Sequence, residues 1–205
     1  MSIGLFVRGL IIGFAIAAPV GPIGMLVIRR TLAEGRLLGL LTGMGAAVAD
    51  ALYGCVGAFG LTLISGVLMS YAIWTRLIGG AFLIYLGIST FRAKPKEETA
   101  GTSKVRYATA FLSTMVLTLA NPATILSFMA VFAGLGLGTK AGDYSAAGIV
   151  VAGVFAGSAI WWLLLASGVS LARHKLKPGT LKWINYGSGA FLSAFGVYAL
   201  LSLAF

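Results

Sequence analysis

The amino-acid sequence predicts an all-α membrane protein: six transmembrane helices forming two inverted three-helix repeats, with broken helices 1 and 4. Three observations lead to this fold class. Hydrophobic residues make up 59% of the 205 residues, charged residues only 10%, and the mean hydropathy is +0.99. A water-soluble domain of this length needs a far more polar surface. Charge-free runs of membrane-spanning length recur along the chain, and a motif in the third predicted helix returns in the last.

Each helix needs about 20 residues to cross about 30 Å of hydrocarbon. The first charge-free run ends at Arg29-Arg30, and the 39-residue run from Leu37 to Thr75 is long enough for two helices, divided at Ser65-Gly66. The predicted spans are 9–28, 39–62, 70–91, one within 107–139, one within 144–172, and 183–205. The N-terminus also has features of a signal peptide with a cleavage site at Ala15-Ile16-Ala17. Retention is favoured because the apolar run continues past that site.

The basic residues predict the orientation in the membrane. Twelve of the 15 Lys and Arg residues fall in segments 29–36, 92–107 and 173–182, and only Arg8, Arg76 and Lys140 lie on the opposite side. By the positive-inside rule these three segments are cytoplasmic loops of a protein in the cytoplasmic (inner) membrane. Both termini are then on the outer side of that membrane. The net charge of +10 is therefore attributed to loops facing an anionic lipid surface rather than to nucleic-acid binding.

A repeat divides the chain into two halves. Gly80-Ala81-Phe82-Leu83 with Gly87 matches Gly189-Ala190-Phe191-Leu192 with Gly196 at a constant offset of 109. An odd number of helices per half requires the halves to be inverted, a transporter architecture with the binding site between them at the bilayer midplane. The predicted units are a first repeat over 1–92, a cytoplasmic linker over 93–106 and a second repeat over 107–205.

Asp50 is the candidate centre of the binding site. It is the only charged residue between Leu37 and Thr75, and a carboxylate at mid-membrane costs about 3 kcal/mol on insertion scales. Small residues share its helix face, so a neighbouring helix or a cavity can approach it. Ser158 falls opposite Asp50 at an offset of 108. Arg76, the one basic candidate for an ion pair with Asp50, is too close to its helix end.

Two predicted helix breaks supply the other candidate site residues. Pro19, Gly21, Pro22 and Gly24 cluster in the first span, where the prolines remove backbone donors and disrupt the preceding turns. Broken backbone at membrane depth is tolerated only against protein or a water-filled cavity, and the resumed half-helix presents a positive N-terminal end. Asn121-Pro122 repeats this arrangement in the fourth span, with Asn121 able either to cap the helix or to contact a ligand.

Composition also argues against other chemistry. The single cysteine, Cys55, and the single histidine, His174, exclude a disulfide, a cysteine metal cluster and a histidine ligand pair. Asp50 has no carboxylate partner within the predicted membrane spans, as an intramembrane acid-pair enzyme would require. We therefore expect no enzyme activity, no metal and no cofactor. Trp161 and Trp162, near Ser158, are interpreted as packing or interfacial residues.

The sequence resembles the LysE/RhtB superfamily of amino-acid exporters along nearly its whole length. The matching residues are Pro19-Val20-Gly21-Pro22, then Gly35, Gly39 and Gly43, Ala49-Asp50 and Asn121-Pro122-Ala123-Thr124. Many relatives have Pro-Gly-Pro where this chain has Pro19-Val20-Gly21-Pro22, and Gly-Asp where it has Ala49-Asp50. These differences indicate a subgroup of the superfamily. The resemblance implies export of amino acids coupled to proton entry, with roles for Asp50, the proline breaks and Asn121.

The predicted function is a secondary transporter that exports an amino acid or related small molecule by proton antiport. In the mechanism we expect, the substrate carboxylate binds near Gly21 and Gly24 while its ammonium competes with a proton for Asp50. Two alternatives stay open at this point: a divalent metal-ion exporter of the same superfamily, and a helper subunit without transport of its own. Glycine-rich helix faces also leave a homo-oligomer open.

Overall fold

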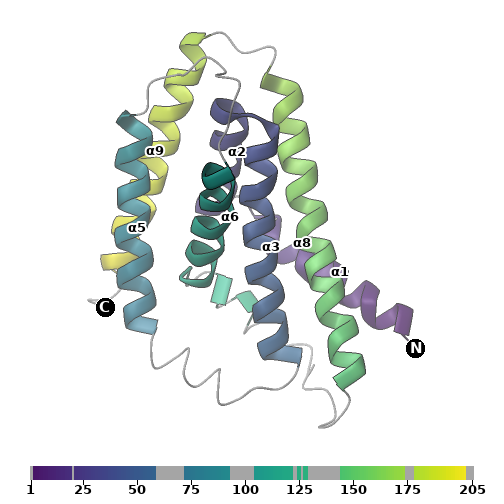
Figure 1. The fold of residues 1–205 in the computed structure, drawn as a ribbon. Coiled ribbons are helices and arrows are strands. Elements are labelled where there is room, and N and C mark those ends of the chain that lie inside the picture. The colour runs from purple at the N-terminus through teal and green to yellow at the C-terminus, as the bar shows by residue number, and fades with distance from the viewer. Residues whose placement is uncertain are drawn as a thin grey trace.

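The structure is a bundle of helices (Figure 1). The computed structural model describes residues 2–19, 21–58, 72–92, 104–121, 124–125, 127–128, 144–173 and 178–201. Within these ranges the long helices are α1 (Ser2–Ala17), α2 (Pro22–Glu34), α3 (Arg36–Ala58), α5 (Ala72–Arg92), α6 (Lys104–Leu119), α8 (Tyr144–Arg173) and α9 (Pro178–Leu201). The all-helical prediction is confirmed for the described part of the chain.

Several of these helices are long and apolar enough to cross a membrane. Among the described residues these are α3, α8 and α9, and the bent pair α1–α2 makes a fourth span if it crosses as one unit. In α5 the apolar stretch Leu77–Arg92 is shorter. The chain is therefore a helical membrane protein, whereas its arrangement as six spans in inverted repeats stays a prediction. The predicted division at Ser65-Gly66 lies outside the described residues.

The first predicted span is broken where the prolines predict it. Helix α1 ends at Ala17, and α2 begins at Pro22 in a direction 79° from that of α1. Proline is suited to the first position of a helix, because its missing N–H would have no intrahelical acceptor there. Gly21 precedes it in an extended conformation. The proline pair thus ends one helix and starts another rather than bending a continuous one.

The segment 29–36, predicted as a loop, is instead mostly helix. Helix α2 runs through to Glu34, and Gly35 alone separates it from α3. Gly35 has φ 99°, a left-handed conformation that glycine adopts readily, and its N–H donates to the carbonyl of Thr31 at 3.2 Å. The reversal between α2 and α3 therefore needs a single residue. The basic residues of segment 29–36 alone cannot show whether that segment is a loop or a pair of helix ends.

This correction places Arg30 inside the protein. Its side chain is only 8% exposed. Its Nη1 donates to Thr42 Oγ1 at 3.1 Å, Ala110 O at 3.0 Å and Thr114 Oγ1 at 3.1 Å, and Nη2 donates to Ser113 Oγ at 3.2 Å. The guanidinium, with its fixed fork of donors, thereby ties α2 to α3 and α6. Nearby, Arg106 Nη2 of α6 lies 2.7 Å from Glu34 Oε2 of α2.

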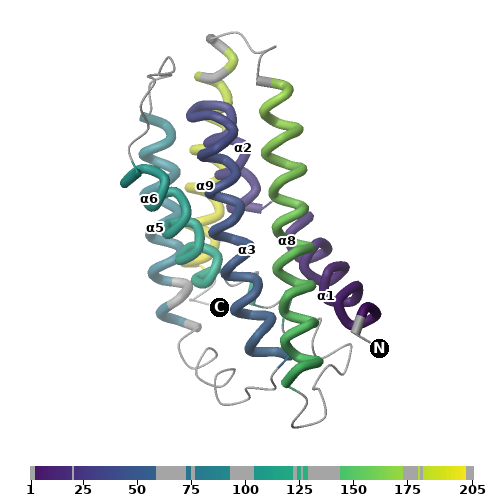
Figure 2. The backbone as a smooth tube through the Cα atoms, turned by 45° about the vertical axis from the view of Figure 1, so that its right-hand side comes forward, coloured from purple at the N-terminus to yellow at the C-terminus, as the bar shows by residue number. Residues whose placement is uncertain are grey.

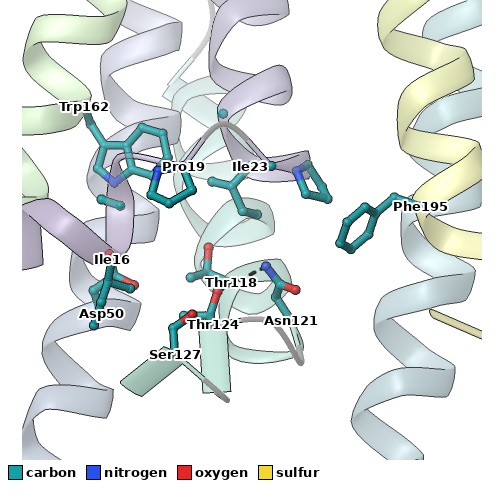
Figure 3. Close-up of a pocket in the computed structure, with 14 residues that line it drawn as sticks. Ile16, Pro19, Ile23, Asp50, Thr118, Asn121, Thr124, Ser127, Trp162 and Phe195 are labelled. Carbon is teal, nitrogen blue, oxygen red and sulfur yellow. Dashed lines mark hydrogen bonds between the residues drawn. The ribbon is translucent and has the colours of Figure 1, made fainter. Parts of the chain in front are cut away.

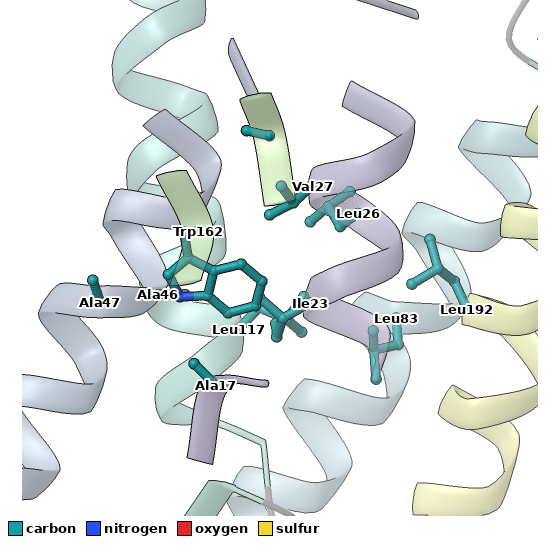
Figure 4. Close-up of a cluster of buried hydrophobic side chains, with 11 residues drawn as sticks. Ala17, Ile23, Leu26, Val27, Ala46, Ala47, Leu83, Leu117, Trp162 and Leu192 are labelled. Carbon is teal, nitrogen blue, oxygen red and sulfur yellow. The ribbon is translucent and has the colours of Figure 1, made fainter. Parts of the chain in front are cut away.

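Pairs of helices pack in a regular order. Helix α1 lies along α8, α5 along α9, and α3 packs between α6 and α8, as the two views of the backbone show (Figures 1 and 2). Helix α2 reaches α3, α8 and α9. Its buried face joins the central hydrophobic cluster, where Leu26 and Val27 meet Trp162 of α8 and Leu192 of α9 (Figure 4).

Glycines that match in the repeat also match in their contacts. Gly80 packs on the carbonyl of Gly196, and Gly87 packs on the carbonyl of Gly189. Because the repeat matches Gly80 with Gly189 and Gly87 with Gly196, replacing each glycine by its match turns one contact into the other. A second correspondence holds between Gly45 and Gly153. A side chain at Gly45 would meet the carbonyl of Phe111 and the amide of Met115. In the same way, a side chain at Gly153 would meet the carbonyl of Phe6 and the amide of Leu10. The predicted two-fold relation between the halves would produce such an exchange of contacts, and that relation stays a prediction.

The charged segments gather at one end of the bundle. The α2–α3 reversal, the end of α5, the end of α8 and the start of α9 lie at the upper end of Figure 1, and the start of α1 and the end of α9 lie in the lower half. Helix α6 begins at Lys104, inside the predicted linker 93–106. The remainder of that linker, 93–103, lies outside the described residues, as does 174–177.

Candidate functional site

The N-terminus of α2 opens onto a cavity. Gly21 is the N-cap residue, and no side chain caps the helix. The N–H of Gly21 donates to Pro19 O at 2.9 Å, and that of Met25 donates to Gly21 O at 3.0 Å. Between them, Ile23 and Gly24 carry first-turn N–H groups that have no acceptor within the helix. Together with the helix dipole, these groups favour an anionic ligand.

Asp50 lies in the middle of α3 and is only 3% exposed. Its Oδ2 accepts a 2.6 Å hydrogen bond from Ser158 Oγ of α8, and Ser158 Oγ accepts a 3.0 Å hydrogen bond from Trp162 Nε1, one turn further along α8. An indole N–H can only donate, so the Ser158 hydroxyl uses its own proton on Asp50. The bond fixes Oδ2 as an acceptor, and among the described groups it leaves Oδ1 for a proton or a ligand.

The end of α6 forms a second broken segment beside the first. The helix ends at Leu119, and the Asn121 carbonyl accepts from the amides of Thr124 at 3.1 Å and Ile125 at 3.2 Å. The Asn121 side chain donates to Thr124 Oγ1 at 3.1 Å. Asn121 therefore both starts the next helical turn and lines the cavity. Pro122 lies outside the described residues.

These elements line one cavity of about 220 Å³ (Figure 3). Helices α1, α2, α3, α6, α8 and α9 all contribute to it. It is lined by Ile16, Ala17, Pro19, Gly21, Pro22, Ile23, Gly24, Asp50, Thr118, Asn121, Thr124, Ser127, Trp162 and Phe195. Six of the eight residues singled out from the sequence are in this list, and Ser158 is hydrogen-bonded to Asp50. The structure thus brings the acid and both helix breaks to one place, while the roles of these residues stay predictions.

Sequence reasoning missed part of the lining. Trp162, interpreted as a packing residue, also forms a cavity wall and the hydrogen bond to Ser158. Thr118 precedes Asn121 by three residues, which would place both on one face of the predicted fourth span, so this spacing could have identified Thr118. Phe195 comes from α9, and no local pattern in the sequence connects it with α2 or α3. Across the described residues, no group of three or more His, Cys, Asp or Glu side chains lies together as a metal site would require.

The chain is similar in sequence to proteins that are named for amino-acid export or efflux. A Bacillus subtilis (strain 168) protein, YcgF, named provisionally as an amino acid efflux protein, is 27% identical over 95% of this chain and 94% of its own length. The Lysine exporter LysE of Corynebacterium efficiens is 25% identical over 96% and 98%, respectively. The Threonine efflux protein of Escherichia coli (strain K12) is 29% identical over 60% and 62%.

These relatives are named as exporters or efflux proteins rather than as enzymes. No solved structure is significantly similar to the chain. The family model of the LysE type translocator matches residues 14–203, which include both helix breaks, Asp50 and every residue that lines the cavity. The chain is a transmembrane member of the LysE type translocator family.

Proposed function

We propose that this protein exports an amino acid, or a closely related zwitterion, across the cytoplasmic membrane in exchange for protons. The observation that carries the proposal is the single cavity that contains Asp50 and the uncapped start of α2. A zwitterion has one positive and one negative group a few ångströms apart, and these two features complement both. The exporter names of the relatives support the same substrate class.

The substrate carboxylate binds at the N–H groups of Ile23 and Gly24, where backbone donors and the helix dipole act together. The substrate ammonium binds Asp50 through Oδ1, because Oδ2 is held by Ser158. Burial strengthens the interaction with Asp50, since little water competes at a side chain that is 3% exposed. An isolated acid would leave the buried charge of Asp50 unpaired, and an isolated amine would leave the N–H groups of α2 without an acceptor, so an intact zwitterion is favoured.

Coupling follows from competition at Asp50. The same oxygen cannot hold the ammonium and a proton, so a proton arriving from outside displaces the substrate. The protonated carboxyl is neutral and is less costly to carry across the membrane than a bare carboxylate. Movement of the two halves about the midplane then returns the site to the cytoplasmic side. In this orientation the basic end of the bundle, with Arg30 and Arg106, faces the cytoplasm.

Asp50→Asn tests the proposal. The amide keeps the size of the carboxyl and can still bond Ser158, but it can neither hold a proton nor pair with an ammonium. In proteoliposomes, transport of amino acids driven by a pH gradient should fall at least about 100-fold, because a buried charge pair is lost. Correct insertion is checked by size-exclusion chromatography and thermal unfolding in detergent.

Glu97→Gln is the matched control, because it removes a carboxylate from the charged segment 93–106. It should retain transport within about twofold. Proton-driven transport that survives Asp50→Asn undiminished would remove Asp50 from the mechanism.

A further inference from the structure

Resting on the proposed function, we infer that the substrate is a small neutral amino acid whose side chain donates a hydrogen bond, through a hydroxyl or an amide. Two independent features of the cavity lead to this class. Its only described carboxylate is already assigned to the substrate ammonium, and one wall is formed by hydroxyl and amide groups.

The distribution of acids argues against a basic side chain. The chain has five acidic residues in all. Glu34 is paired with Arg106 at 2.7 Å and does not line the cavity. Glu97 and Glu98 belong to the charged segment 93–106, and Asp143 precedes α8 by one residue, 15 residues before Ser158. Among the described residues, Asp50 is the only acid that lines the cavity, so a second cation there would have no described counter-charge.

The hydroxyl wall argues for a hydrogen-bonding side chain. Thr118, Asn121, Thr124 and Ser127 come from the end of α6 and the segment after it, and Figure 3 shows them together beneath the α1–α2 break. Thr118 is the most informative of them. Its hydroxyl donates to Thr114 O at 2.8 Å, so toward the cavity its oxygen can only accept. An acceptor here complements an O–H or N–H of the ligand and disfavours a carboxylate side chain.

The size of the cavity limits the ligand further. Its volume of about 220 Å³ is below the roughly 300–1,000 Å³ of sites for drug-sized ligands. Ile16, Ile23 and Phe195 supply apolar contacts for methyl or methylene groups. The site is therefore suited to a side chain of a few atoms that ends in, or contains, a polar donor.

The test is the substrate profile of the full-length protein in proteoliposomes loaded in turn with threonine, glutamine, valine, lysine and glutamate. Threonine and valine have nearly the same shape and differ by one hydroxyl. A site built to hydrogen-bond a hydroxyl discriminates strongly against the analogue that lacks it. We expect transport of threonine or glutamine to exceed that of valine, lysine and glutamate by at least about tenfold.

Thr118→Val should then reduce the preference for threonine over valine toward unity, while Thr118→Ser should retain it. Thr109→Val is the matched control, because Thr109 lies exposed on the same helix and donates to Val105 O in the same way, at 2.8 Å. Wild-type protein that carries lysine or valine as well as threonine overturns this inference and leaves amino-acid export standing. Wild-type protein that carries none of the five amino acids, with or without a pH gradient, overturns both.

Discussion

At the scale of single residues, the Asp50–Ser158–Trp162 chain decides how the central carboxylate is presented. In this series of hydrogen bonds, the indole N–H of Trp162 donates to Ser158, and the Ser158 hydroxyl donates to Asp50. The sequence placed Ser158 opposite Asp50 by the repeat offset, but it could not give the direction of the bond. That direction depends on Trp162, which the sequence analysis interpreted as a packing residue. Its indole N–H donates to Ser158 and so leaves the Ser158 hydroxyl to donate to Asp50.

Ser158→Ala should move the pH dependence of transport. The Ser158 hydroxyl stabilises the ionised form of Asp50, and a hydrogen bond to a charged group contributes about 1.5–3 kcal/mol. Without it, protonation occurs more readily, and the midpoint of the transport–pH profile should rise by about one to two pH units. Ser158→Thr keeps the hydroxyl and should keep the midpoint. The measurement is uptake rate across a pH series.

Trp162→Phe checks the role of the indole nitrogen. It keeps an aromatic wall but removes the donor to Ser158, so the midpoint should shift in the same direction by a smaller amount. Trp161→Phe is the control, since Trp161 packs edge-on against Phe14 with ring centroids 5.4 Å apart. An equal shift in both variants would show that packing, rather than the hydrogen bond, sets the profile.

At the scale of elements, the break between α1 and α2 shows what sequence patterns can and cannot predict. Pro19 and Pro22 identify the break because proline removes donors and fixes φ, and the structure begins α2 at Pro22. The sequence could not show that α2 continues to Glu34, because Arg29 and Arg30 look like the start of a loop. Whether such an arginine is buried depends on Thr42, Ser113 and Thr114 from other helices.

Gly21→Ala tests the α2 N-terminus as an anion site. Gly21 has φ −101°, which alanine adopts without strain, and a Cβ there would meet no protein atom within 4 Å. The methyl would point into open space beside the backbone donors. We expect a thermal midpoint close to that of the wild type and a KM at least about fivefold higher, because access to the N–H groups is reduced. Gly168→Ala, also in open space, is the control for the substitution itself.

Gly157→Ala tests how α1 and α8 pack. A Cβ at Gly157 would collide with the Leu10 carbonyl and lie 2.8 Å from the Phe14 amide nitrogen, whereas one at Gly148 of the same helix meets nothing. Overpacking of this kind costs about 1–3 kcal/mol. Thermal unfolding in detergent should show a lower midpoint for Gly157→Ala and an unchanged or higher one for Gly148→Ala. Equal midpoints would mean that α1 is not held closely against α8.

At the scale of the whole molecule, the basic end of the bundle predicts the orientation in the membrane. The structure brings the charged helix ends together at one end of the bundle. It is the positive-inside rule that assigns this end to the cytoplasmic side of the membrane. The matched glycines of the repeated motif are also the contact glycines between α5 and α9, a pairing that the sequence analysis did not predict. The cavity could not be anticipated in full, since Phe195 reaches it only through the packing of α9 against α2.

Cysteine labelling tests this orientation. In a Cys55→Ser background, which removes the chain's single cysteine, Ile3→Cys and Val105→Cys introduce thiols at positions 78% and 73% exposed. A membrane-impermeant maleimide added to intact cells should label position 3 and should spare position 105. Inverted vesicles should give the opposite result. Labelling of position 105 in intact cells would reverse the proposed topology.

The pairing of Asp50 with Ser158 has a consequence for energetics. Matched positions of the two halves meet in a hydrogen bond, yet one half supplies an acid and the other an alcohol. Of this pair only Asp50 can gain and lose a proton near neutral pH, so the pair carries one proton per cycle. Exchange of one proton for one neutral zwitterion moves a single positive charge inward. Export should therefore be electrogenic, so that each 100 mV of membrane potential adds about 2.3 kcal/mol to the driving force supplied by the pH gradient.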